Sequence, residues 1–347
     1  MANLANLTPF AARLLHSIDK EGAERLVVCI AGRFDMPKPG QSVSGRLRPA
    51  VKQVPPPVQD VFWGEPGLSS LRYETQSTYY RPGTDIYLNG HARPPDRRPV
   101  KEMTVRLEVG PCKKEVLVIG DRTWGGGILG LGASAPRAFD AMPLVYERSF
   151  GGNLPKEAGR NAEMEPRNPV GRGLYRDASE AEGQPLPNLE DPKRPVRSWS
   201  DRPAPVGFGA VFRAWQPRVA LAGTYDSRWL EERCPLWPLD LDLRHFQGAA
   251  PGLVATPYLK GGEPVRIEGV SPDGVIEFRV PHHRLTFKSV FRDRVDVQAP
   301  VIDGLLLEPD DAAVTLFWRA SHPVRKELPR HEYSVVRELE PWEEEPR

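Results

Sequence analysis

The sequence is poor in cysteine. It has three, Cys29, Cys112 and Cys234, which lie far apart and form no C-x-x-C pair. Structural zinc sites use closely spaced cysteines, and the disulfide frameworks of small secreted proteins use an even and dense set. The pattern therefore argues against both kinds of site. It is typical of a reducing compartment, so we expect a cytoplasmic protein.

Long hydrophobic runs are also missing, and so is an excess of charge of one sign. No stretch approaches the roughly 20 apolar residues of a transmembrane helix, and the opening residues lack the cationic and apolar parts of a signal peptide. The chain carries 47 basic and 46 acidic residues, a net charge of +1. Proteins that bind along the phosphate backbone of a nucleic acid need an excess or a stripe of basic residues, so we expect no nucleic acid as partner. Because long apolar runs are missing, we expect no membrane as partner either.

Proline and glycine are abundant, with 38 and 31 copies among 347 residues. Proline fixes φ and removes a backbone donor, so proline-dense segments form neither regular helix nor central strand. Regular periodicity fades between Arg122 and Pro257, yet tryptophan and phenylalanine are present there, and disordered linkers are poor in aromatics. We therefore predict a long, ordered but irregular Pro/Gly-rich central region held in place by aromatic side chains.

Strand patterns lie on both sides of this region. In residues 101–109 the side chains of Met103, Val105, Leu107 and Val109 share one face. A turn at residues 110–113 and a second run at 115–119 complete a hairpin signal. Similar apolar runs predict further strands at residues 25–34, 84–89, 264–270, 275–280, 285–291, 294–298, 304–308, 313–318 and 334–339.

Long helical periodicity is absent. One short helix is predicted at residues 227–233, where Asp226 can cap the start and Pro235 stops the end. We therefore predict a mainly β fold with few short helices, in which antiparallel sheets form a sandwich-like structure. Residues 1–257 are expected as an N-terminal β-rich region, 258–340 as a C-terminal strand region packed on it in one continuous unit, and 341–347 as an acidic tail.

The glycine run at residues 125–130 matches G-x-G-x-x-G after a predicted strand. A dinucleotide site needs a helix to begin at these glycines within a βαβ unit, and Pro136 would stop such a helix early. A glycine loop that lets backbones pack closely is the favoured interpretation. We expect no cofactor.

One tight cluster of acids and histidine is present, formed by Asp240, Asp242 and His245. On a strand the two aspartates would share a face and the histidine would point away, so turn capping is favoured over a metal site. His282 and His283 are adjacent and are expected in a loop. No familiar catalytic motif is present. We expect no catalytic or metal-binding residues, while a hydrolase built on two distant carboxylates stays open as an alternative.

An ordered series of short phrases identifies a family. They are NLTPF (6–10), RPGTD (81–85), GHA (90–92), GDRTW (120–124), PLVYERSFGG (143–152), NPVGRG (168–173), LPNLEDP (186–192), WQPR (215–218) and AGTYD (222–226) followed by Trp229. In this order they resemble the bacterial family named domain of unknown function 2169, over about residues 6–281.

The resemblance implies an adaptor or chaperone of type VI secretion. Members of the family are typically encoded beside the PAAR-repeat tip and the valine–glycine repeat spike. They are understood to stabilise a toxic effector and to help load it onto that spike. The implied partners are therefore a secreted effector protein, a PAAR-type spike tip protein, or both. A structural accessory of a contractile injection apparatus and an uncharacterised hydrolase are the alternatives.

Nine residues of these phrases are candidates either for partner binding or for holding the scaffold. Large aromatics beside glycine and proline can clamp loops, whereas aromatics together with arginine are favoured in interface hot spots. Arg148 and Arg218 can staple loops by binding carboxylates such as Asp226 or Glu147. The candidates are Trp124, Tyr146, Arg148, Phe150, Trp215, Arg218, Tyr225, Asp226 and Trp229.

Overall fold

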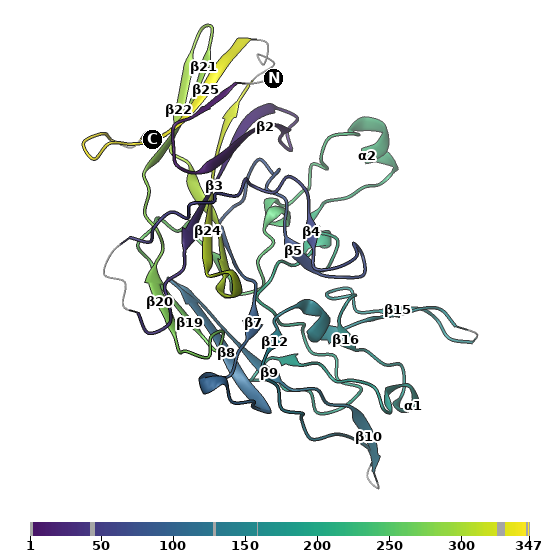
Figure 1. Ribbon diagram of the computed structural model, residues 1–347. Coiled ribbons are helices and arrows are strands. Elements are labelled where there is room, and N and C mark those ends of the chain that lie inside the picture. The colour runs from purple at the N-terminus through teal and green to yellow at the C-terminus, as the bar shows by residue number, and fades with distance from the viewer. Residues whose placement is uncertain are drawn as a thin grey trace.

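The chain folds mainly into β-strands, which confirms the predicted fold class (Figure 1). The computed structural model describes residues 3–41, 46–127, 130–157, 159–324, 330–344 and 346. Sheets of six, five and four strands carry most of the regular structure. No helix in these described ranges is long and apolar enough to cross a membrane.

The six-stranded sheet is buried on both faces along its strand β3 (Glu24–Asp35). Val28 and Ile30 point into the main core, while Cys29 and Ala31 point to the opposite side. A continuous run of β-branched and apolar residues suits a strand of this kind. The strand order is β18 (Val254–Ala255), β6 (Thr84–Leu88), β23 (Val301–Glu308), β24 (Ala313–Pro323), β3 and β2 (Ala11–Ile18). Only the β6–β23 pair in this sheet is parallel.

The five-stranded sheet is antiparallel and has one apolar face. Its centre is the predicted hairpin of β8 (Glu102–Val109) and β9 (Cys112–Ile119), whose turn is tighter than expected because β9 already begins at Cys112. The predicted face is confirmed, since Val105, Leu107 and Val109 are buried and Met103 packs against them. The strand order is β17 (Leu189–Glu190), β9, β8, β19 (Pro264–Glu268) and β20 (Ile276–Arg279).

The four-stranded sheet joins the two ends of the described chain. Its order is β1 (Leu4–Asn6), β25 (His331–Glu338), β21 (Leu285–Phe291) and β22 (Val295–Gln298), and β1 runs parallel to β25. In Figure 1 this sheet stands at the top, and the sheet with β8, β9 and β19 lies below β3 and β24.

One buried core is shared by all three sheets, as expected for a sandwich-like fold. Ile30 and Leu316 come from the six-stranded sheet, Val105 and Ile267 from the five-stranded sheet, and Phe287 from the four-stranded sheet. The core therefore joins strands from both ends of the sequence.

The central region forms mainly short strand pairs and turns, while its strand β17 joins the five-stranded sheet and its strand β18 the six-stranded sheet. Its predicted helix is confirmed as α2 (Ser227–Glu232), and the Asp226 side chain accepts the Trp229 N–H at 2.8 Å. The other short strands, three of which precede this region, are β4 (Val61–Phe62), β5 (Leu71–Tyr73), β7 (His91–Ala92), β10 (Trp124–Gly127), β11 (Gly130–Ala133), β12 (Met142–Pro143), β13 (Phe150–Gly151), β14 (Asn153–Leu154), β15 (Glu163–Met164) and β16 (Arg172–Gly173). The remaining helical turns are α1 (Ala178–Ala181), η1 (Pro95–Arg97), η2 (Tyr146–Arg148), η3 (Arg218–Leu221), η4 (Leu243–Phe246) and η5 (Pro309–Asp311).

The glycine run lies in an antiparallel pair, β10 with β11, and Ile128 and Leu129 between them lie outside the described residues. No helix begins at its described glycines, so the run lacks the strand-to-helix geometry of a dinucleotide site.

Candidate functional site

Five of the nine candidate residues are buried, and at most 6% of the surface of each residue is exposed to solvent. Trp124 packs with Tyr175, Ala181 and Leu186 in a small cluster of its own. Such a cluster anchors the β10–β11 hairpin to the segment that follows α1. The other four buried candidates are Tyr146, Phe150, Trp215 and Arg218.

Tyr146 and Trp215 meet in a second small cluster. Their ring centroids lie 5.9 Å apart with the rings nearly perpendicular, and Val211 packs beside them. Edge-to-face contact is a favourable geometry for an aromatic pair. These two side chains therefore clamp two segments that are far apart in sequence.

Gly151 is required by the turn that follows Phe150. Its φ is +155°, and a Cβ placed on it would lie 2.1 Å from the carbonyl oxygen of Asn168. The buried Asn168 side chain donates to the carbonyl oxygens of Tyr146 and Phe150 at 2.8 and 2.9 Å. Only glycine allows the two backbones to approach this closely.

Arg148 links loops as predicted, but its partners are not the predicted Glu147 or Asp226. Its Nη1 donates to Asp121 Oδ1 at 2.9 Å and to Asn188 Oδ1 at 3.1 Å. The proposed partner Glu147 instead accepts from the backbone N–H and the hydroxyl of Ser70, both at 2.7 Å. The expected pairing with Glu147 is therefore wrong, because the Glu147 carboxylate is bound by Ser70 and the Arg148 guanidinium by Asp121 and Asn188.

Arg218 belongs to a network of ionised side chains that we call the buried charge cluster. It consists of Glu74, Arg81, Asp85, Arg218, Asp303 and Arg319. The Arg218 guanidinium donates from Nη2 to Glu74 Oε1 at 2.7 Å, and its other contacts are backbone carbonyl oxygens of Val211 and His245. The predicted pairing of an arginine with Asp226 is therefore wrong, because Asp226 caps α2 and Arg218 points into the protein.

The buried charge cluster joins the central region to the six-stranded sheet. Asp85 lies on β6, Asp303 on β23 and Arg319 on β24, all on the face away from the main core. Arg81 Nε lies 3.6 Å from Asp85 Oδ2, and Arg319 Nε donates to Asp303 Oδ2. Removal of one member would leave an opposite charge buried without compensation.

The pKa values of Asp85 and Glu74 shift in opposite directions. Burial raises the pKa of Asp85 to about 6, in spite of the nearby Arg81. Burial also opposes ionisation of Glu74, but the guanidiniums of Arg218 and Arg81 outweigh it and lower the pKa of Glu74. Each of the three carboxylates lies within 4 Å of a guanidinium, as in structural ion-pair networks.

A small cavity of about 140 Å³ borders this cluster. Glu74, Arg213 and Arg218 line its polar side, and Trp237 and Phe246 line its aromatic side. It lies between residues 74–81 and the central region. The size fits one side chain or a few waters.

The remaining candidates lie in a protruding segment, residues 219–241, which we call the α2 lobe (Figure 1). Tyr225 and Trp229 contact each other edge to face, with centroids 4.6 Å apart. Trp229 Nε1 donates to the carbonyl oxygen of Leu236 at 2.9 Å, which closes the lobe behind the helix. The lobe is attached to the N-terminal region where the guanidinium of Arg233 donates to the carbonyl oxygen of Lys20.

The α2 lobe exposes several large apolar side chains. Val219 is 40% exposed, Tyr225 51%, Leu230 62% and Leu239 72%. Isolated exposed apolar residues need no explanation, whereas four within one short segment make the lobe a candidate interaction surface. The structure thus brings Tyr225, Asp226 and Trp229 together on a surface, separate from the buried candidates.

The acid and histidine cluster caps turns. Asp240 accepts from the Thr224 N–H and hydroxyl, Asp242 caps η4, and the His245 ring bonds the carbonyl oxygen of Arg218. Across the described ranges, no three His, Cys, Asp or Glu side chains are placed to hold a metal ion. His282 lies in a loop, as predicted, and so does its neighbour His283.

Sequence reasoning missed most of the buried charge cluster. Asp85, Asp303 and Arg319 each interrupt an apolar strand, and a charge in such a run is a signal for a buried ion pair. This pattern does not show which residues pair with each other, because partners such as Glu74 and Arg218 are 144 positions apart in the sequence.

The sequence model of a family described as "Uncharacterized protein conserved in bacteria (DUF2169)" matches residues 21–319, which is more than half of the chain. No curated protein and no solved structure matches.

Proposed function

The chain belongs to the DUF2169 family, and from this premise we propose that it is a protein-binding adaptor of type VI secretion. In this proposal it binds and stabilises a toxic effector and helps load it onto the PAAR-type tip or the valine–glycine repeat spike. The ordered family phrases support the biological setting. The observation that carries the binding role is the exposed apolar surface of the α2 lobe.

The composition of the α2 lobe suits a protein interface. Tyrosine, tryptophan and leucine supply large contact areas, and tyrosine and tryptophan are enriched in hot spots. Full burial of one leucine side chain contributes about 1.5–3 kcal/mol. Leu230 and Leu239 are the two most exposed apolar side chains of the lobe, so their burial by a partner would supply much of the affinity.

The lobe is held in a fixed conformation before any partner binds. Asp226 caps α2, and Thr224 Oγ1 donates to Asp240 Oδ2 at 2.7 Å across the base of the lobe. Arg218, at the entrance to the lobe, is fixed by the buried charge cluster. A preorganised surface loses little conformational entropy on binding, which favours affinity.

An adaptor of this kind acts by mass action. An adaptor that binds only the folded effector stabilises the effector by about 2.7 kcal/mol when the free adaptor concentration is a hundred times Kd. Coverage of an exposed apolar segment of the effector also suppresses aggregation before loading. Both effects need a binding surface and no catalytic residue.

Co-expression with the effector and the PAAR-type tip encoded by neighbouring genes tests the proposal. The unchanged chain is expected to co-purify with at least one of them through size-exclusion chromatography. Leu230→Asp is expected to weaken that complex at least about tenfold, since it replaces buried apolar area with a charge. Val51→Asp is a matched control, because Val51 is fully exposed on a different loop. If Leu230→Asp and Val51→Asp bind as well as the unchanged chain, the α2 lobe is not the interface.

A further inference from the structure

Strand β22 (Val295–Gln298) is an unpaired sheet edge. It pairs antiparallel with β21 on one side, and no strand of the described ranges pairs with its other side. Alternate backbone N–H and C=O groups of an edge strand point outward and can pair with another chain. Proteins that bind extended peptides use such edges.

The outer face of the four-stranded sheet is apolar next to this edge. Val295 is 52% exposed and Val297 44%. The strand register places Val290 beside Val295, and Tyr333, which is also exposed, beside Val290. Val335 lies in the neighbouring row. An added strand would therefore find apolar cross-strand neighbours on this face.

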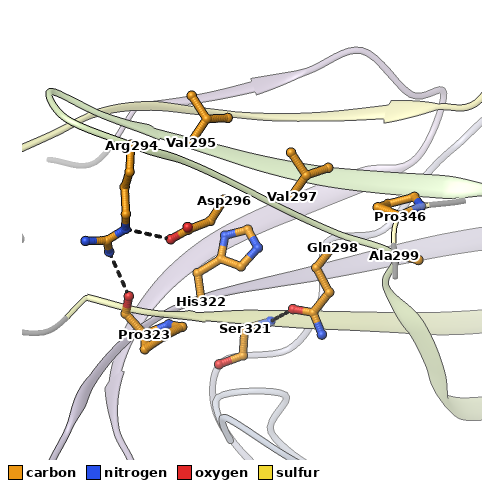
Figure 2. Close-up of a pocket in the computed structure, with 10 residues that line it drawn as sticks. All are labelled: Arg294, Val295, Asp296, Val297, Gln298, Ala299, Ser321, His322, Pro323 and Pro346. Carbon is orange, nitrogen blue, oxygen red and sulfur yellow. Dashed lines mark hydrogen bonds and ion pairs between the residues drawn. The ribbon is translucent and has the colours of Figure 1, made fainter.

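A groove of about 630 Å³ runs along β22 and is also lined by residues 321–323 and by Pro346 (Figure 2). Asp296 and Gln298 point into it from β22, and His322 points into it from β24. Gln298 Oε1 accepts the backbone N–H of Ser321 at 3.1 Å, which links the two strands across the groove. The inward-facing side chains of an added strand would lie in this groove.

His322 is a buried polar group in this groove with one unused nitrogen. Its Nδ1 bonds the Ser289 hydroxyl at 3.0 Å, while its buried Nε2 has no hydrogen-bond partner. Buried polar atoms are nearly always hydrogen-bonded, so an unpaired one marks a place for a ligand atom or a water. A polar side chain or backbone group of an added segment can satisfy this nitrogen.

The charge around the edge favours an acidic occupant. Lys288 lies between Val297 and Val335 in the register, and Arg292 precedes the turn into β22; both are exposed. Two of the acids nearby are already paired, Asp293 with Arg330 at 3.1 Å and Asp296 with Arg294 at 3.0 Å. Lys288 and Arg292 have no ion-pair partner among the described residues. The apolar face therefore carries the cation of Lys288 among its valines, with Arg292 at its end.

We propose that β22 is a strand-addition site for an extended, acidic segment of a partner protein with alternating apolar side chains. The apolar side chains would lie beside Val295 and Val297, and the opposite side chains would enter the groove at His322. A second copy of this chain fits less well, because pairing two β22 edges would bring the cations at Lys288 and Arg292 of both copies together.

The site is separate from the α2 lobe, and Figure 1 shows β22 and α2 on opposite sides of the molecule. The inference therefore stands without the lobe. An adaptor with both surfaces can hold two partners, or two parts of one partner, at the same time.

A peptide of sequence EVTVTVE, labelled with fluorescein, is the probe for this site. We expect it to bind the full chain in fluorescence anisotropy and to slow amide hydrogen exchange at residues 295–298. Two control peptides, EVTPTVE and KVTVTVK, are expected to bind at least about tenfold more weakly, because proline removes a strand hydrogen bond and lysine reverses the charge.

Variants of the chain locate the site. Val297→Asp is expected to weaken binding of the EVTVTVE peptide at least about tenfold, since it removes an apolar neighbour and adds a like charge. Val61→Asp is the matched control, because Val61 is an equally exposed valine of the short strand β4, and it is expected to bind normally. Leu230→Asp is expected to leave peptide binding unchanged, so failure of the lobe and failure of this site are distinguishable.

Three outcomes would overturn the proposal. The first is an EVTVTVE peptide that does not protect residues 295–298. The second is equal binding of the proline peptide. The third is a chain that dimerises and that Val297→Asp converts to a monomer, because the occupant of β22 is then a second copy.

Discussion

Arg218→Met tests the buried charge cluster most severely. Arg218 is 5% exposed and donates four hydrogen bonds, one to Glu74 and three to the carbonyl oxygens of Val211 and His245. Methionine fills much of the same volume but supplies no donor. The substitution therefore leaves the Glu74 carboxylate without its closest cation and leaves backbone acceptors unpaired.

The magnitude follows from the burial of the pair. Removal of one partner of a buried ion pair costs about 3–5 kcal/mol, because an uncompensated charge stays in the interior. The other two cations near Glu74 lie farther away. Arg213 Nη2, on a partly exposed side chain, is 3.8 Å from Glu74 Oε1, and Arg81 Nη2 is 3.9 Å from Glu74 Oε2 and also pairs with Asp85. We expect a loss of about 4 kcal/mol, a large share of the roughly 5–15 kcal/mol that stabilises a typical domain.

Urea unfolding followed by tryptophan fluorescence measures this loss. Arg228→Met is the matched control, because Arg228 forms an exposed pair with Glu232 on α2 and its removal should change the unfolding free energy little. The double variant Glu74→Gln with Arg218→Met should cost about 2 kcal/mol less than the sum of the single variants. A loss below about 1 kcal/mol for Arg218→Met, or strict additivity in the double variant, would refute the argument.

Three further predictions concern other parts of the molecule. Burial lowers the pKa of His322 from 6.5 to about 4. Between these two pH values the unfolded state binds more protons than the folded state. The free energy of unfolding should therefore fall by about 3 kcal/mol as pH decreases from 6.5 to 4. Asp85, whose pKa is raised to about 6, acts in the opposite direction, so the test is whether His322→Asn removes this fall relative to the unchanged chain. Gly151→Ala should lower the free energy of unfolding in urea by about 3 kcal/mol, because the positive φ of Gly151 and the nearby Asn168 carbonyl leave no room for a Cβ. An unfolding midpoint equal to that of the unchanged chain would contradict this. Asp226→Ala should cost about 1 kcal/mol and speed amide exchange in α2, and unchanged exchange would show that the cap is not needed.

Local patterns predicted the strands well. The hairpin of β8 and β9 depends on alternation within a few residues, and the α2 cap depends on Asp226 and Trp229 three positions apart. Strand β2 (Ala11–Ile18) shows where this fails. Its sequence, AARLLHSI, has apolar residues at helical spacing, and it becomes a strand because β3 offers it eight paired positions. Such long-range pairing is invisible in a local pattern.

The candidate site was predictable in part. The family phrases contained Arg81, Asp85 and Arg218, but nothing in the sequence pairs Arg218 with Glu74 in preference to Asp226. The pairing depends on how the central region lies on the six-stranded sheet. Exposure also depends on the fold, so the sequence could not separate buried Trp215 from the surface residue Tyr225.

Affinity purification from a strain that carries the neighbouring type VI secretion genes tests the central proposal most directly. With the chain tagged at its natural level, mass spectrometry is expected to recover the effector or the PAAR-type tip encoded beside it, in a complex that survives size-exclusion chromatography. The same purification with Leu230→Asp should lose that protein. Recovery of neither the effector nor the tip with the unchanged chain would contradict the adaptor proposal.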